Sequence, residues 1–227
     1  MNEISEFSKS GRPEFSRVIL GNSIREFGMV GGEGRKAIVS VDVVGSEGRM
    51  RNVGNFLIKE ISSSKLNPTG AGLEGLAEKI EERYFLLKAE FLASKKKGAM
   101  GYVPLPPTLR RQDNKILMTD MRNNGSNLVI DFNSFKENEG VRVKNREEID
   151  GELEAASEAA LRAGIILGID AYAIVVSKKS KEGQLYLLDI GLNTFKIDEY
   201  KGEKTPEKAA ADQIEGFKVL MGFYLKR

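Results

Sequence analysis

The sequence predicts an α+β fold with two lobes, the first built on an antiparallel sheet and the second small and mainly helical. Three observations lead to this prediction. The N-terminal residues are polar. They are followed by short segments that are rich in β-branched residues and are separated by glycine-rich turns. Apolar residues recur every three or four positions in residues 73–97, which is the pattern of an amphipathic helix. A third segment begins with Thr205-Pro206, a typical helix start.

The first lobe is expected over residues 15–121, after a loose tail at residues 1–14. It combines three strands, one long helix and a hairpin. The strands are predicted at residues 17–20, 37–43 and 55–59, the helix at 73–97, and the hairpin strands at 108–111 and 115–121. Cations at Lys95 to Lys97 and the following Gly98 suit the end of that helix.

The second lobe is expected over residues 122–227, with the boundary between lobes near residues 120–125. It is predicted to hold fewer strands and two helices. The strands are predicted at residues 127–133, 174–176 and 185–188, and the helices at 149–167 and 205–224. The element order is therefore strands, helix, strands, helix, hairpin and helix.

Composition excludes several kinds of chemistry. The chain has no cysteine, so a disulfide framework and a thiolate metal site are excluded. It has no histidine, which excludes a Ser-His-Asp triad, a histidine-ligated zinc and a histidine general base. Its 35 basic and 33 acidic residues leave a net charge of +2, which argues against a dedicated nucleic-acid site. Any catalysis must use carboxylates, Lys, Tyr, hydroxyls or a carboxylate-bound metal.

Hydropathy predicts a protein without a membrane span. The longest apolar stretch, residues 163–176, is interrupted by Gly168 and Asp170 and is too short to cross a bilayer. The first dozen residues lack the apolar core of a signal peptide. The expected location is the cytoplasm.

Four glycines, Gly28, Gly31, Gly32 and Gly34, lie between two predicted strands. Glycine lets backbone amides approach phosphate oxygens, since no Cβ stands in the way. No Gly-Lys-Ser/Thr follows, so the segment is not a P-loop. A simple hairpin turn is the alternative interpretation.

Three further segments carry candidate site residues. Lys59 follows the apolar run Phe56-Leu57-Ile58, and an edge charge is its alternative interpretation. Residues 115–121 form a predicted strand that ends in Thr119-Asp120-Met121. The strand of residues 185–188 leads into Asp189-Ile190-Gly191. A similar carboxylate in Asp131-Phe132-Asn133 lacks the glycine and precedes the second helix, so it is ranked lower.

In this order the four segments resemble the protein-kinase-like fold, in particular its aminoglycoside-phosphotransferase branch. The resemblance covers about residues 27–195. It implies that the glycine segment covers the phosphates of ATP and that Lys59 grips the α- and β-phosphates. A helix glutamate pairs with that lysine in the family, and Glu82 and Glu90 are both candidates here.

The resemblance also implies an adenine site and a metal site. Backbone groups of Thr119, Asp120 and Met121 would hold the adenine ring, and Asp189 would bind Mg²⁺ bridging the phosphates. Asp170 lies near the place of the catalytic aspartate and could accept a proton from a substrate hydroxyl, or could cap a turn.

The chain also departs from the family pattern. The metal-binding asparagine expected after the catalytic aspartate is missing, because Ala173 and Val175 occupy that region. Only residues 192–227 follow the Asp-Ile-Gly element, which leaves little room for a substrate lobe. Both departures indicate a minimal kinase or a pseudokinase.

Three hypotheses follow for function. The first is a kinase-like nucleotide-binding protein that uses ATP and Mg²⁺, with weak or absent phosphotransfer. The second is a non-catalytic scaffold on the same fold that binds a protein partner. The third is an ATP-grasp-like ligase, in which Asp189 and Asn193 would be the late metal-binding residues.

Overall fold

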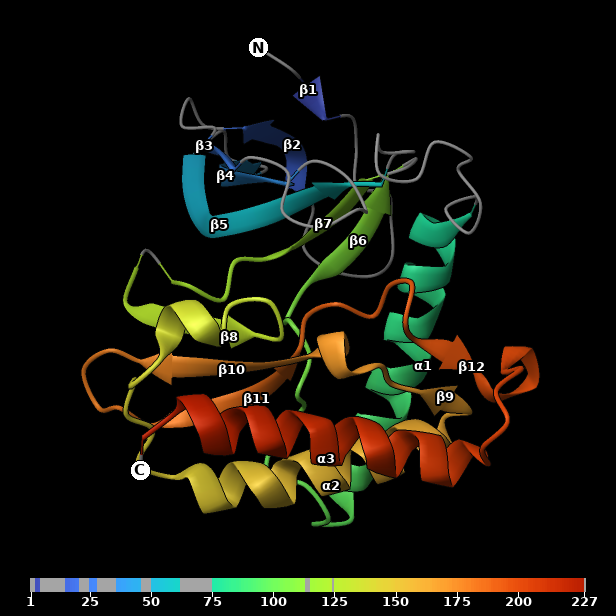
Figure 1. The fold of residues 1–227 in the computed structure, drawn as a ribbon. Coiled ribbons are helices and arrows are strands. Elements are labelled where there is room, and N and C mark those ends of the chain that lie inside the picture. Colours follow the sequence, from blue (N-terminus) through green and yellow to red (C-terminus); the bar gives the residue numbers. More distant parts are fainter. Residues whose placement is uncertain are drawn as a thin grey trace. The chain divides into compact units, whose positions relative to one another are not determined.

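The computed structural model describes residues 3–4, 15–20, 25–27, 36–45, 50–61, 75–112, 115–123 and 125–226. The fold is α+β with antiparallel sheets (Figure 1). The chain forms two compact units, each made of two separate stretches. Met1–Ala77 and Pro107–Asn123 form the first, and Glu78–Pro106 and Asn124–Arg227 form the second. The helix of the long amphipathic segment thus groups almost entirely with the second unit.

The first unit is an antiparallel sheet. Its strand order is β1-β2-β4-β5-β7-β6, and β3 pairs with β4. The strands are β1 (Glu3–Ile4), β2 (Phe15–Leu20), β3 (Arg25–Phe27), β4 (Lys36–Gly45), β5 (Met50–Glu60), β6 (Leu109–Gln112) and β7 (Lys115–Thr119). The strands and the hairpin predicted for this part of the chain are confirmed.

The second unit combines helices with two small sheets. One sheet has the order β11-β10-β8, and the other pairs β12 with β9. The helices are α1 (Leu76–Lys96), α2 (Arg146–Arg162), α3 (Pro206–Tyr224) and the short 3-10 helices η1 (Lys136–Asn138), η2 (Ile169–Ala171) and η3 (Ile197–Glu199). The strands are β8 (Asn127–Asp131), β9 (Ile165–Ile166), β10 (Tyr172–Ser177), β11 (Gly183–Leu187) and β12 (Phe195–Lys196).

The core of the second unit lies where α2 and α3 pack beside each other (Figure 1). Ile149 and Leu153 on α2 and Phe217 on α3 are fully buried. The Phe217 ring lies 5.5 Å from the ring of Tyr172, which begins β10, so aromatic packing joins α3 to the sheet. Among the described residues, no helix is long and apolar enough to cross a membrane.

Both predicted ends of α3 are confirmed. The helix runs from Pro206 to Tyr224, and Thr205 caps it by accepting a hydrogen bond from the Lys208 amide at 3.3 Å. The prediction of a helix up to residue 167 is wrong, because α2 ends at Arg162. Gly164 adopts a φ of 76°, a left-handed conformation that ends helices, and a strand follows.

A substitution at Gly183 tests the packing beneath α2. A Cβ at this position would lie 2.8 Å from Ile149 Cδ1 and 2.9 Å from Ile174 Cγ2. We expect Gly183→Ala to lower the free energy of unfolding by about 1–3 kcal/mol through overpacking, as measured by urea denaturation. Gly101→Ala is the control, because an added Cβ there meets no atom within 4 Å. Equal stability of the two variants would contradict this packing.

Candidate functional site

Two acidic loops of the second unit lie together. Asp170 sits in η2, between β9 and β10, and Asp189 follows β11. The Leu188 amide donates a hydrogen bond of 2.9 Å to the Ala171 carbonyl, so the sequence neighbours of the two aspartates are bonded to each other. Beyond Asp189 the chain returns, and β12 pairs with β9. The structure therefore brings the predicted metal residue and the predicted catalytic residue into one region.

Asn193 joins this region from the loop that follows Asp189. Its Nδ2 donates a hydrogen bond of 2.7 Å to Asp170 Oδ2. Gly168 makes this approach possible, because a Cβ there would clash with the Asn193 carbonyl oxygen and lie 2.7 Å from Asp170 Oδ1. Asp170 Oδ1 itself is buried. In this arrangement the Asp170 carboxylate orients Asn193.

Arg83 of α1 fixes the backbone just after Asp189. Its side chain is buried, with 4% exposure, and its Nη1 donates hydrogen bonds to the carbonyls of Gly191 at 2.6 Å and Ile190 at 3.3 Å. Burial lowers the pKa of Arg83, and the charges of Glu199 and Glu82 oppose that shift. The guanidinium stays protonated, since arginine does not lose its proton in proteins. A buried cation thus holds the Asp-Ile-Gly element in place.

Lys59 lies in the sheet of the first unit. It is on β5, between β4 and β7, opposite Lys36 and Ile116. Its exposure is only 5%, so it is a buried residue of a central strand and not an edge charge. The phosphate role of Lys59 stays a prediction.

The end of β7 is held by local hydrogen bonds. The Thr108 amide donates to Thr119 Oγ1 at 3.2 Å, and the Thr119 amide donates to the Thr108 carbonyl at 3.1 Å. Asp120 Oδ1 accepts from the amide of Arg122 at 3.2 Å and from its Nε at 2.8 Å. These bonds fix the turn that carries Met121. The adenine role of Thr119, Asp120 and Met121 stays a prediction.

The two candidate glutamates of α1 have ion-pair partners in the second unit. Glu82 accepts a 2.6 Å hydrogen bond from Lys196, which raises the pKa of that lysine. Glu90 accepts a 2.7 Å bond from Arg162, and this hydrogen bond lowers the pKa of Glu90. Pairing of either glutamate with Lys59 stays a prediction.

The glycine segment with Gly28, Gly31, Gly32 and Gly34 lies outside the described residues. The rival carboxylate Asp131 accepts hydrogen bonds from the amides of Asn133 and Ser134 at 3.1 and 3.0 Å. Its Oδ1 therefore stabilises a turn.

Sequence reasoning missed the roles of Arg83 and Gly168. Arg83 falls on the apolar stripe of its helix between Ile80 and Leu87, and a cation in such a stripe is a signal of a buried partner. Gly168 directly precedes the Asp170 turn, and only the three-dimensional approach of Asn193 explains it.

A scan against protein-family models found no match, and a search of curated proteins found none either.

Replacing Arg83 tests whether it holds the Asp-Ile-Gly element. Arg83→Met removes charged donors from two carbonyls while keeping most of the side-chain volume. We expect the free energy of unfolding to fall by about 1.5–3 kcal/mol, the range for hydrogen bonds to charged groups. Lys196→Met is the control, and it should cause a much smaller loss because its ion pair with Glu82 is exposed to solvent. Urea denaturation distinguishes the two, and an Arg83 variant as stable as the wild type would contradict the assignment.

Proposed function

We propose that this chain binds a nucleoside triphosphate together with Mg²⁺, in the manner of the protein-kinase-like fold, and that its phosphotransfer is weak or absent. One observation carries the proposal. The Asp170 and Asp189 loops are linked through the Leu188–Ala171 hydrogen bond, and β12 returns from Asp189 to pair with β9. The proposed function needs two acidic loops that lie next to each other, and here they flank the β10–β11 hairpin.

The donor set fits Mg²⁺ that arrives with phosphates. The Asp189 carboxylate and the Asn193 amide oxygen are hard oxygen ligands, and Mg²⁺ is usually bound by one or two carboxylates together with substrate phosphates. Within the described ranges, no three acidic side chains gather as a metal-binding group. The proposed Mg²⁺ site therefore includes nucleotide phosphates as well as protein ligands. Bound Mg²⁺ would neutralise phosphate charge.

Asn193 supports the proposal by supplying what the sequence pattern lacks. The family places a metal-binding asparagine shortly after the catalytic aspartate, and Ala173 and Val175 lie there instead. Asn193 comes from the other loop, yet its side chain reaches Asp170. We propose Asp189 and Asn193 as the metal ligands.

Asp170 is better suited to positioning than to proton transfer. Its Oδ1 is buried, and its Oδ2 already accepts the hydrogen bond from Asn193. A general base must reach the proton that it removes. Since neither oxygen is poised for an incoming hydroxyl in this conformation, the geometry favours nucleotide binding over efficient phosphotransfer.

A thermal-shift titration with ATP, with and without Mg²⁺, tests the proposal. Ligand that binds only the native state stabilises it by about 2.7 kcal/mol at a hundredfold excess over Kd, which corresponds to roughly 5–10 °C in Tm for a chain of this size. We expect this shift to require Mg²⁺ and to be lost in Asp189→Asn.

Asp131→Asn is the matched control, because it removes the same charge from a turn and should leave the ATP-dependent shift intact. No shift at millimolar ATP, or a shift equally large in Asp189→Asn, would contradict the proposal. The non-catalytic scaffold would then be the better account.

A further inference from the structure

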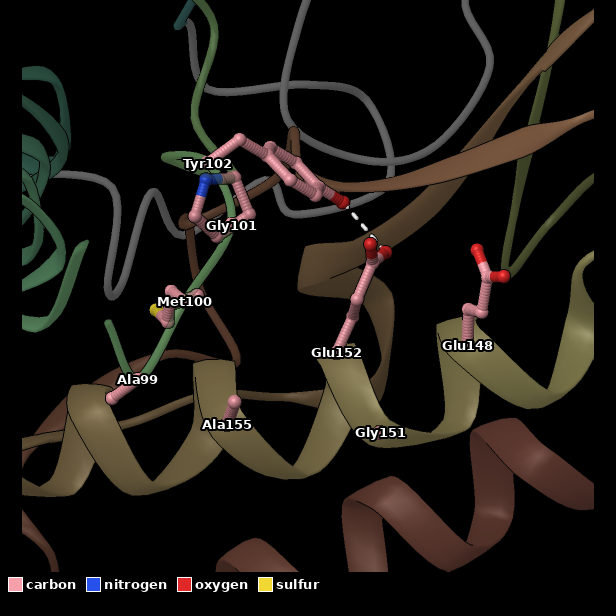
Figure 2. A pocket seen from close by; sticks show the side chains of 9 residues that line it. Ala99, Met100, Gly101, Tyr102, Glu148, Gly151, Glu152 and Ala155 are labelled. Atoms are coloured by element: carbon pink, nitrogen blue, oxygen red, sulfur yellow. Dashed lines mark hydrogen bonds between the residues drawn. The ribbon is translucent and has the colours of Figure 1, made fainter.

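A cavity lies in the second unit, lined by none of the residues of the Asp170–Asp189 region. The cavity has a volume of about 220 Å³ and is lined by the segment that follows α1 and by α2 (Figure 2). Tyr102 covers it from that segment, and Glu148 and Glu152 project from α2 toward the same side. The remaining lining is formed by Met100 and small residues.

Glu152 is held in a fixed orientation. Its Oε2 accepts a 2.7 Å hydrogen bond from the Tyr102 hydroxyl and a 3.2 Å bond from the Leu185 amide. Burial, followed by the hydrogen bond to Glu152, raises the pKa of Tyr102, so the hydroxyl remains a donor. Neither bond uses Glu152 Oε1, which leaves that oxygen to accept a bond from a ligand. The carboxylate is thus preorganised by two donors on one side.

Glu148 adds a second carboxylate one turn away on α2, the spacing that places side chains on one face. Its Oε2 accepts a 3.2 Å hydrogen bond from Asn145. The cavity lining contains no basic residue to neutralise the two carboxylates. The cavity therefore combines negative charge with an aromatic ring and apolar walls.

Gly151 lines the cavity from within α2, and local packing does not explain why this helix position is a glycine. A glycine inside a helix is about 0.5–1 kcal/mol less favourable than alanine. A Cβ at Gly151 would meet no atom within 4 Å, so no neighbour requires the missing side chain. Its effect is to keep the cavity floor open.

We propose that this cavity binds an alkylammonium group on a short aliphatic stem. Carboxylates accept charge-assisted hydrogen bonds from the ammonium, the Tyr102 ring offers a cation–π surface, and the apolar walls accommodate the stem. The volume is below the 300–1,000 Å³ range of drug-sized ligand sites and suits a single lysine-like chain. The source is either a small free amine or a lysine of a partner protein. This inference is independent of the nucleotide proposal.

Amide chemical-shift titration of the full chain tests the site with two probes, cadaverine and the capped tripeptide Ac-Gly-Lys-Gly-NH₂. We expect saturable shifts at Gly101, Gly151 and Glu152, and none with sodium chloride at equal ionic strength or with the Nε-acetylated tripeptide. Tighter binding of cadaverine identifies a small amine, and tighter binding of the tripeptide identifies a protein lysine.

Glu152→Gln gives the sharpest comparison. The glutamine oxygen can still accept from Tyr102 and Leu185, while its amide nitrogen places a donor where the ammonium would bind. We expect at least about tenfold weaker binding, the loss of one charged hydrogen bond. Glu154→Gln is the matched control, because Glu154 points to Lys218 on α3 and should leave the affinity unchanged.

Gly151→Leu provides an independent variant, since it fills the cavity floor without removing charge and leucine is a good helix former. It should abolish the saturable shifts in a protein at least as stable as the wild type. Absence of saturable shifts in the wild type, or unchanged affinity in Glu152→Gln and Gly151→Leu, would overturn the inference.

Discussion

The backbone hydrogen bond from Leu188 to Ala171 is the constraint on which the candidate site depends. It joins two loops that are separated by the β10–β11 hairpin, at the residues next to Asp170 and Asp189. The pairing of β12 with β9 closes the region from the other side. Together with the pairing of Tyr172 and Leu187 in the hairpin, this link keeps the two aspartate loops next to each other.

Arg83 and Gly168 act on the chain segments next to this link. Arg83 compensates its own burial by bonding to the Ile190 and Gly191 carbonyls, so a helix residue positions the loop after Asp189. Gly168 leaves room for the Asn193 backbone. The Asn193 side chain lies against Asp170 and occupies one of the oxygens that a proton-transfer role would require. Under the proposed function, the same packing favours ligand binding over proton transfer.

Sequence signals from neighbouring residues predicted most helices and strands. Contacts between residues far apart in the sequence could not be predicted in this way. Thr205-Pro206 located α3, because a cap and a first-turn proline act through neighbouring residues. The apolar run after Arg162 continued the helical pattern, yet Gly164 ends α2 and the following isoleucines form β9. A two-residue strand such as β9 is defined only by its partner β12, about thirty residues away. Asp189 was predicted from its strand and glycine, whereas the Asn193 contact depends on the return of the chain.

The most direct test of the central claim is paramagnetic relaxation with Mn²⁺ in place of Mg²⁺, measured on the full chain with a non-hydrolysable ATP analogue. Mn²⁺ shares the oxygen-ligand preference of Mg²⁺ and broadens the resonances of nearby nuclei. The account predicts nucleotide-dependent broadening centred on Asp189, Asn193 and Asp170. Broadening centred elsewhere, or none when the analogue is added, would contradict it.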